Sequence, residues 1–111
     1  MTHSLPIHIP IDEAQLRAFC ERWHITALSL FGSVLRDDFR PDSDIDVLVT
    51  IEPAFAKTLS LMTLVGMANE LEDMFGREVD LLERSWIEAS HNPVRRKAIL
   101  STAQEVYRAA A

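Results

Sequence analysis

The chain has 111 residues, with 11 Lys and Arg against 17 Asp and Glu, which gives a formal net charge of −6. Its length is that of one domain, and 48% hydrophobic with 25% charged residues is typical of a soluble globular protein. No stretch approaches the roughly 20 apolar residues of a membrane helix, and the start lacks the basic residues of a secretory signal. We therefore expect a cytoplasmic protein without a membrane partner, forming a single domain over residues 1–111, with a loose segment at 1–10 and a core at about 12–108.

The acidic balance and the single cysteine exclude several classes of protein. Nonspecific binding to nucleic acid depends on Lys and Arg that neutralise phosphates, so we expect no direct nucleic-acid partner for a chain of charge −6. Cys20 alone can form neither an internal disulfide nor a thiolate zinc cluster. Disulfide scaffolds and zinc fingers are thereby excluded.

The first half of the chain predicts a helix, a strand, a short helix and a second strand. Acidic residues at 12 and 13 precede an apolar helical repeat that continues to Trp23. Residues 25–31 predict a strand that runs into a tight turn at Gly32-Ser33, and a short helix is expected at 34–38. Residues 44–51, DIDVLVTI, are rich in β-branched side chains and predict the second strand.

The second half predicts a long helix, a third strand and a closing helix. Residues 58–75 keep a helical period and are followed by Gly76, a typical helix stop. Residues 78–83, EVDLLE, are mostly apolar and predict a strand, and Asn92-Pro93 begins the closing helix. The expected order is helix, strand, helix, strand, helix, strand, helix.

Five carboxylates lie within the ten residues from 37 to 46. Because side chains alternate along a strand, Asp44 and Asp46 emerge on one face while Ile45 and Val47 point into the core. Two carboxylates at the rim of a sheet can hold Mg²⁺ together with water and substrate phosphates. A solvated acidic turn is the plainer alternative for this segment alone.

Two further features extend this acidic pair into a candidate site. Asp80 is a single carboxylate between apolar residues; if its strand lies beside 44–51, it completes a three-carboxylate site able to hold two metal ions. Asp80 is otherwise an ordinary residue of an edge strand. Gly32-Ser33 follows a strand, where backbone N–H groups can face phosphate oxygens, although a simple turn and helix cap is the alternative.

The combination of these motifs resembles a known superfamily. Gly32-Ser33, ten intervening residues, Asp44-x-Asp46 and a later Asp80 resemble the signature of the DNA polymerase β-like nucleotidyltransferases. The run GSVLRDDFRPDSDIDVLV, with Arg36, resembles the minimal nucleotidyltransferase (MNT) branch, which includes the MntA-like antitoxins paired with HEPN-domain toxins. The resemblance implies the nucleotidyltransferase fold, an α/β (α+β) single domain with a small mixed sheet flanked by helices.

The resemblance also implies an activity. An MntA-like antitoxin transfers AMP from ATP to a tyrosine of its HEPN toxin, blocks the toxin's ribonuclease activity and uses two Mg²⁺ ions. By this resemblance Asp44 and Asp46 would bind both ions. Asp80 would bind the ion at the acceptor hydroxyl and take its proton, while Gly32 and Ser33 hold the β- and γ-phosphates. Arg36 either contacts phosphate or pairs with the acidic loop.

Other functions stay open beside this one. Leu35 and Asp37 stand where the MNT pattern has Ala and Gly, which suggests a catalytically weak antitoxin that neutralises its toxin by binding alone. A small-molecule nucleotidyltransferase is a third possibility, although such enzymes carry additional substrate-binding structure. The basic run 95–97 in the closing helix is either part of a docking surface or a solvated helix face.

Overall fold

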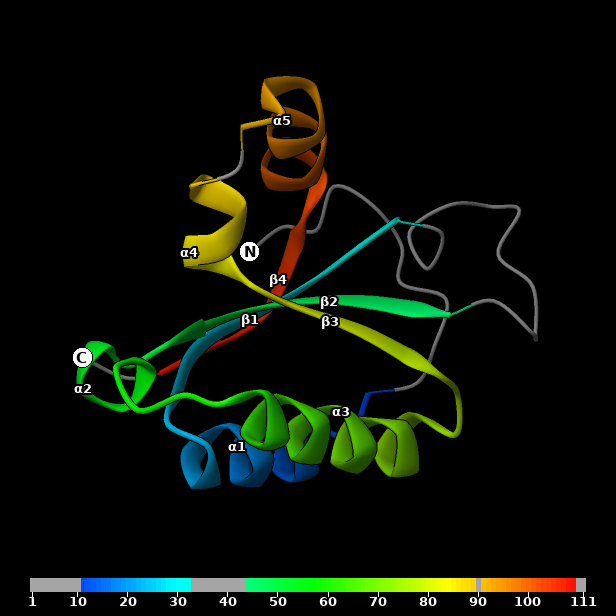
Figure 1. Ribbon diagram of the computed structural model, residues 1–111. Coiled ribbons are helices and arrows are strands. Elements are labelled where there is room, and N and C mark those ends of the chain that lie inside the picture. The colour runs from blue at the N-terminus through cyan, green and yellow to red at the C-terminus, as the bar shows by residue number, and fades with distance from the viewer. Residues whose placement is uncertain (1–10, 33–43, 90, 110–111) are drawn as a thin grey trace.

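The computed structural model describes residues 11–32, 44–89 and 91–109 (Figure 1). Its helices and strands are α1 (Glu13–Arg22), β1 (Ile25–Phe31), β2 (Ile45–Ile51), α2 (Pro53–Ala56), α3 (Leu61–Phe75), β3 (Val79–Glu83), α4 (Arg84–Glu88), α5 (Pro93–Thr102) and β4 (Gln104–Arg108). Within these ranges no helix combines the length and the apolar character needed to cross a membrane.

The four strands form one mixed sheet in the order β3-β2-β1-β4. β1 pairs antiparallel with both β2 and β4, whereas β2 and β3 are parallel. A parallel pair needs a crossover connection, and α2 and α3 supply it between β2 and β3. The predicted fold class, a small mixed sheet flanked by helices, is confirmed.

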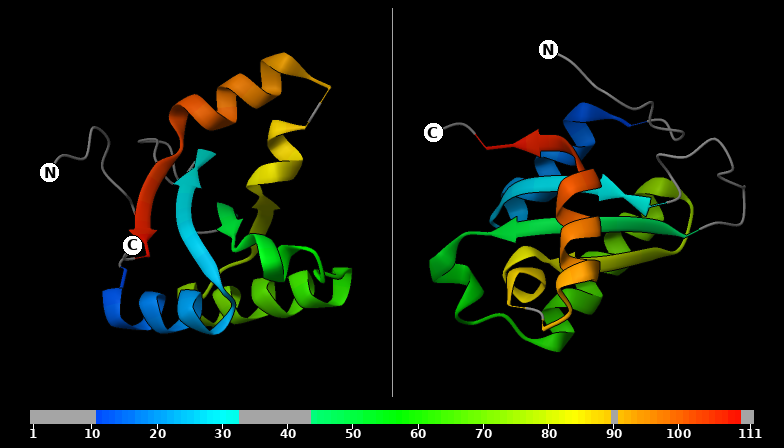
Figure 2. Two further views of the ribbon diagram at one scale, coloured as in Figure 1. Left: turned by 90° about the vertical axis from the view of Figure 1, so that its left-hand side faces the viewer. Right: turned by 90° about the horizontal axis from the view of Figure 1, so that it is seen from above.

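The main core lies between one face of the sheet and the helices α1 and α3 (Figure 2). Its side chains follow the two periodicities expected from the sequence, every third or fourth residue on the helices and every second residue on β2. Members that are fully buried include Leu16 and Phe19 of α1, Met67 and Leu71 of α3, and Ile45, Val47 and Val49 of β2.

The opposite face of the sheet carries a smaller core beneath α4 and α5. Phe31 and Leu48 from the sheet pack there against Ile87 of α4 and Ile99 of α5. Leu48 belongs to this second cluster while its neighbours Val47 and Val49 belong to the first. Even-numbered side chains of β2 therefore point away from the main core, and Asp46 is one of them.

The acidic start of α1, Gly76 after α3 and Asn92 before α5 agree with the signals in the sequence, whereas α3 begins at Leu61 after its cap Ser60, three residues later than expected. The side chains of Asp12, Ser60 and Asn92 accept hydrogen bonds from backbone N–H groups at the starts of α1, α3 and α5, and each such cap contributes about 1 kcal/mol. Gly76 ends α3 with a φ of 70°, in the left-handed conformation that glycine adopts without strain.

The prediction that the chain closes with a helix is wrong. α5 ends at Thr102, and residues 104–108 form β4 at the edge of the sheet. Val106 and Tyr107 pack against the main core, while Glu105 and Arg108, both within β4, form an ion pair. The short helices α2 and α4 are not predicted from the sequence, and the helix expected at 34–38 lies outside the described residues.

Cys20 is fully buried in the main core, and we predict that it is chemically inert in the folded protein. Burial, together with the nearby charge of Glu21, raises the pKa of its thiol from 9.0 to about 12. Because the thiolate is the reactive form, only about one molecule in ten thousand is reactive at pH 8. Native protein should resist a maleimide and react after unfolding in urea; rapid labelling of the native protein would contradict the packing of α1.

Candidate active site

The structure places the two strands that carry the predicted carboxylates next to each other. β2 and β3 pair in parallel with Asp46 opposite Asp80, so the two side chains lie on the same face of strands about 4.8 Å apart. Asp44 comes just before β2, where the backbone N–H of Ile45 donates to the carbonyl oxygen of Glu78 at 2.9 Å. The two strands thus lie side by side, as the predicted site requires, with Asp46 opposite Asp80 and Asp44 two residues before Asp46.

Asp80 is also an edge-strand residue, because β3 is the outermost strand on its side of the sheet. Its side chain is exposed, whereas that of Asp46, on an inner strand, is half-buried. The interpretation of Asp80 as an edge-strand residue is therefore confirmed, and its role in a metal site stays a prediction. The half-buried carboxylate of Asp46 thus lies beside the exposed carboxylate of Asp80.

Gly32 lies at the end of β1, directly beside Asp46. Phe31 is the register partner of Asp46, and Gly32 has a φ of +77°. A Cβ added at Gly32 would overlap Oδ2 of Asp46 and lie 3.1 Å from its Cγ. Glycine at this position is therefore required by the carboxylate as well as by the backbone conformation.

The chemistry of these side chains fits a hard cation. Mg²⁺ prefers oxygen ligands and is held by one or two carboxylates together with water and substrate phosphates. In the described part of the chain no group of three or more His, Cys, Asp or Glu side chains is arranged to hold a metal ion. The metal-binding roles of Asp44, Asp46 and Asp80 thus stay predictions, supported by the type and placement of the donors.

The predicted phosphate loop lies mostly outside the described residues. Gly32 is described, but Ser33 and Arg36 are not, and neither are Leu35 and Asp37. Their roles in nucleotide binding remain predictions from the sequence.

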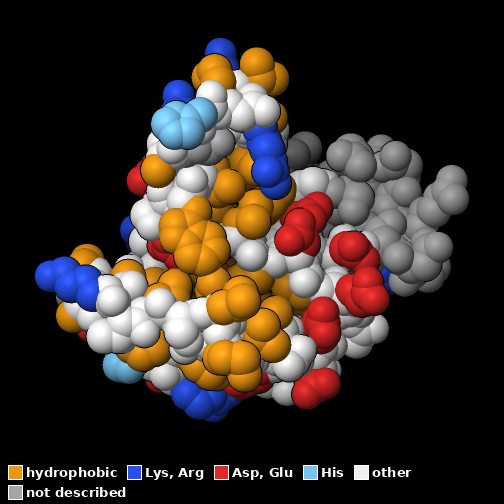
Figure 3. Space-filling view, viewed as in Figure 1, with side chains coloured by type: hydrophobic (Ala, Val, Ile, Leu, Met, Phe, Trp, Pro, Cys, Tyr) orange, Lys and Arg blue, Asp and Glu red, His pale blue; other side chains and the backbone are white. Residues whose placement is uncertain are grey.

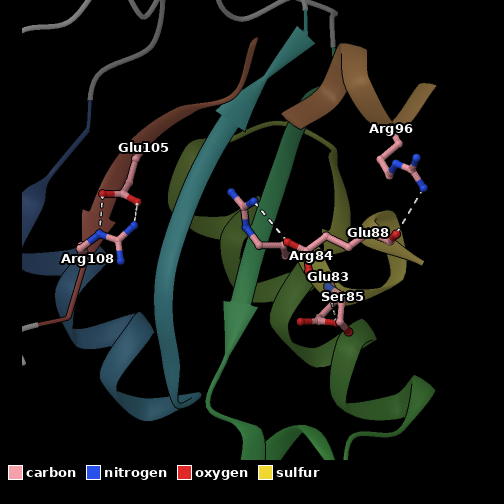
Figure 4. A network of polar contacts seen from close by, with 7 residues as sticks. All are labelled: Glu83, Arg84, Ser85, Glu88, Arg96, Glu105 and Arg108. Carbon is pink, nitrogen blue, oxygen red and sulfur yellow. Dashed lines mark hydrogen bonds and ion pairs between the residues drawn. The ribbon is translucent and has the colours of Figure 1, made fainter. Parts of the chain in front are cut away.

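A network of polar contacts holds α4 and α5 over the carboxylate-bearing face (Figure 4). Glu83, buried at the end of β3, accepts hydrogen bonds from the backbone N–H of Ser85 at 3.1 Å and from the hydroxyl of Ser85. Arg84 pairs with Glu88 at 3.7 Å, and Nη1 of Arg96 donates to the backbone oxygen of Glu88 at 3.5 Å. Arg96 thus joins α5 to α4, whereas Arg95 and Lys97 are exposed.

A cavity of about 500 Å³ lies elsewhere, between α1 and β4. It is lined by Glu13, Leu16, Arg17, Glu21, Val106, Tyr107 and Arg108. None of the predicted site residues lines it, so the candidate active site is the acidic end of β2 and β3.

Known proteins match this chain over most of its length. The profile of the nucleotidyltransferase domain family covers residues 13–106. A Methanocaldococcus jannaschii protein provisionally named a protein adenylyltransferase is 33% identical over 79 residues, which are 71% of this chain and 74% of the relative. The protein adenylyltransferase MntA of Thermococcus cleftensis is 34% identical over 65 residues, 59% of this chain and 62% of the relative.

Solved structures share the fold. A chain in the crystal structure of a toxin–antitoxin with AMP-PNP superposes with a TM-score of 0.66 at 19% identity, over 89% of this chain and 75% of that one. A chain provisionally described as a minimal nucleotidyltransferase gives 0.58 at 29% identity, over 84% and 94%. The complex of a tri-AMPylated Shewanella oneidensis HEPN toxin with its MNT antitoxin gives 0.57 at 18% identity, over 87% and 70%.

The sequence matches, together with the fold, define the class of the protein. The chain belongs to the nucleotidyltransferase domain family and is a nucleotidyltransferase enzyme.

Replacement of Gly32 by alanine should displace the carboxylate of Asp46. A left-handed backbone costs a non-glycine residue roughly 1–2 kcal/mol, and the overlap with Oδ2 adds to that cost. Because displacement of a side chain at the candidate active site should slow catalysis strongly, we expect nucleotidyl transfer to fall about 10²-fold. Urea unfolding and transfer from labelled ATP measure the two effects.

Gly76→Ala is the matched control, since Gly76 has a φ of +70° and nothing within 4 Å of an added Cβ. It should lose roughly 1–2 kcal/mol of stability and keep full transfer activity. Equal activities of the two variants would show that Gly32 does not position Asp46.

Proposed function

We propose that the protein transfers AMP from ATP to a tyrosine hydroxyl of a HEPN-domain toxin, in a Mg²⁺-dependent reaction, and thereby acts as its antitoxin. The observation that carries this proposal is the pairing of Asp46 with Asp80 on parallel strands beside the close turn at Gly32. The names of the relatives support a protein acceptor, and AMP-PNP and an AMPylated HEPN toxin occur in structures that share the fold.

Asp44, Asp46 and Asp80 would hold the Mg²⁺ ions. When bound, the ions would neutralise triphosphate charge and stabilise charge that develops on the attacking and leaving oxygens. The backbone N–H of Gly32, beside Asp46 at the end of β1, would donate to phosphate oxygens. Ser33 would add its hydroxyl and backbone N–H to the same phosphates.

The reaction forms a bond between the tyrosine oxygen and the α-phosphorus and breaks the bond from that phosphorus to the oxygen that bridges to the β-phosphorus. Pyrophosphate leaves, and the carboxylate of Asp80 accepts the proton of the tyrosine hydroxyl. Asp80 suits this role because it is exposed on an edge strand, where a side chain of another protein can reach it. Asp46, half-buried on the inner strand, suits the fixed role of a ligand.

A second candidate function is neutralisation by binding alone. Leu35 and Asp37 favour it, because a bulkier side chain and an extra negative charge beside a triphosphate both oppose nucleotide binding. The two functions differ in whether the carboxylates of the site matter for neutralisation.

Asp44→Asn combined with Asp46→Asn should abolish transfer and leave the fold intact. Amide side chains keep the shape of the carboxylates and remove the charge that attracts Mg²⁺. After coexpression with the HEPN-domain toxin, intact mass of the toxin should show added AMP with the wild type and none with the variant. Purified wild type with excess EDTA in place of Mg²⁺ should behave like the variant.

The matched control is Glu13→Gln combined with Glu21→Gln. It changes the net charge by the same amount, at two exposed residues of α1 that lie beside the separate cavity. This control should modify the toxin normally. If the wild type and the Asp44→Asn, Asp46→Asn variant both suppress toxicity and neither changes the mass of the toxin, the transferase proposal fails. Neutralisation by binding alone would then be the function.

Asp80→Asn should slow the chemical step more than it weakens nucleotide binding. Loss of a general base costs about 10²–10⁴-fold in rate, so kcat should fall by that factor. The Kd for AMP-PNP should change less than it does in Asp46→Asn. Equal losses of kcat and of AMP-PNP affinity would assign Asp80 to ligand binding alone.

A further inference from the structure

Four large hydrophobic side chains lie exposed on α3 and α4. Leu61 and Met62 are 76% exposed, Val65 is 44% exposed, and Trp86 of α4 is 53% exposed. Figure 3 shows hydrophobic side chains gathered on this face, over the first turns of α3 and over α4. We call these four residues the α3–α4 patch.

The α3–α4 patch holds more large apolar side chains than scattered surface residues explain. Single exposed apolar residues are common, but several together with a tryptophan are typical of a surface that binds another protein. The buried face of α3 is already supplied by Leu64, Met67 and Leu71, so the patch residues are not needed for the core. We infer from their exposure that another protein binds here.

Acidic side chains border the patch at the end where β3 begins. Asp73 of α3, Glu78 and Asp80 are exposed there, and Figure 3 shows acidic residues gathered on that side of the same face. From Leu61 to Asp73 the helix extends about 18 Å. Helix α3 thus extends from the patch to the acidic end at which the candidate active site lies.

We propose that the α3–α4 patch is the docking surface for the protein acceptor, which presents an apolar centre with Lys and Arg on the side that meets Asp73, Glu78 and Asp80. Docking on the patch brings the acceptor hydroxyl to Asp80 at the sheet edge. This inference rests on the proposed function, because it names the surface that a protein acceptor uses. Complementary charge at the acidic end orients the acceptor and speeds its association.

A second copy of this chain fits the surface less well. Each copy carries a net charge of −6, and a two-fold contact through the patch would bring two such charges together without compensation. A basic acceptor instead neutralises the acidic end.

The chain offers a closely matched pair of variants. Met62 is the second residue of α3 after its cap Ser60, and Val94 is the second residue of α5 after its cap Asn92. They are 76% and 79% exposed. Met62→Glu and Val94→Glu therefore add the same charge at equivalent helix positions, one inside the patch and one outside it.

With the HEPN-domain toxin as acceptor, Met62→Glu should raise the KM for the toxin at least tenfold and leave the Kd for AMP-PNP unchanged. Trp86→Ala should act in the same direction, because a tryptophan that anchors an interface commonly contributes more than 1 kcal/mol. Val94→Glu should match the wild type in both measurements. An equal KM for Met62→Glu and Val94→Glu would overturn the docking surface.

The failure of the proposed function can be told apart from the failure of this inference. If the wild type adds no AMP to the toxin, the transferase proposal fails, and the Kd for the toxin then tests the patch alone. A tenfold weaker Kd for Met62→Glu would support the patch, and an unchanged Kd would overturn it. Light scattering that shows the wild type as a dimer and Met62→Glu as a monomer would assign the patch to a second copy and overturn the proposal.

Discussion

The parallel pairing of β2 with β3 is the constraint on which the candidate site depends. It aligns Asp46 with Asp80, and the hydrogen bond from Ile45 to Glu78 continues the alignment toward Asp44. A shift of one residue would turn Asp80 toward the main core, where Val79 and Leu81 now pack. Burial of those two side chains under α3 therefore holds the register that the carboxylates need.

The two faces of the sheet are covered by different helices and carry different side chains. α1 and α3 close one face with the main core, while α4 and α5 cover the other with a smaller cluster. Asp46 and Asp80 lie on that second face at the end where the strands begin, with Gly32 against Asp46. The polar network from Glu83 to Arg96 keeps α4 and α5 in place beside them. The main core thus supports the acidic end of β2 and β3, where the side chain of Asp80 is exposed.

Because β3 lies at the edge of the sheet, Asp80 is accessible from the side of the proposed docking surface. An inner strand would enclose Asp80 between neighbours, whereas the edge leaves its side chain exposed beside α3 and α4. Met62 and Trp86 are exposed, and Figure 3 shows hydrophobic side chains over α3 and α4 with acidic side chains beside them on the same face. A protein acceptor that covers this face would contact the apolar side chains and the proposed general base together.

The sequence by itself determined the family, through the motif of Gly32-Ser33, Asp44-x-Asp46 and Asp80. It also determined three of the four strands, the ends marked by Gly76 and Asn92, and the alternation along β2, because periodicity and capping act within a few residues along the chain. Only the tertiary structure decided that β4 closes the sheet, that β3 is an edge strand, that Gly32 lies against Asp46 and that Trp86 is exposed. Residues 104–108 become a strand by pairing with β1, more than seventy residues earlier. Each of these features depends on contacts between residues far apart in the chain, which local patterns do not encode.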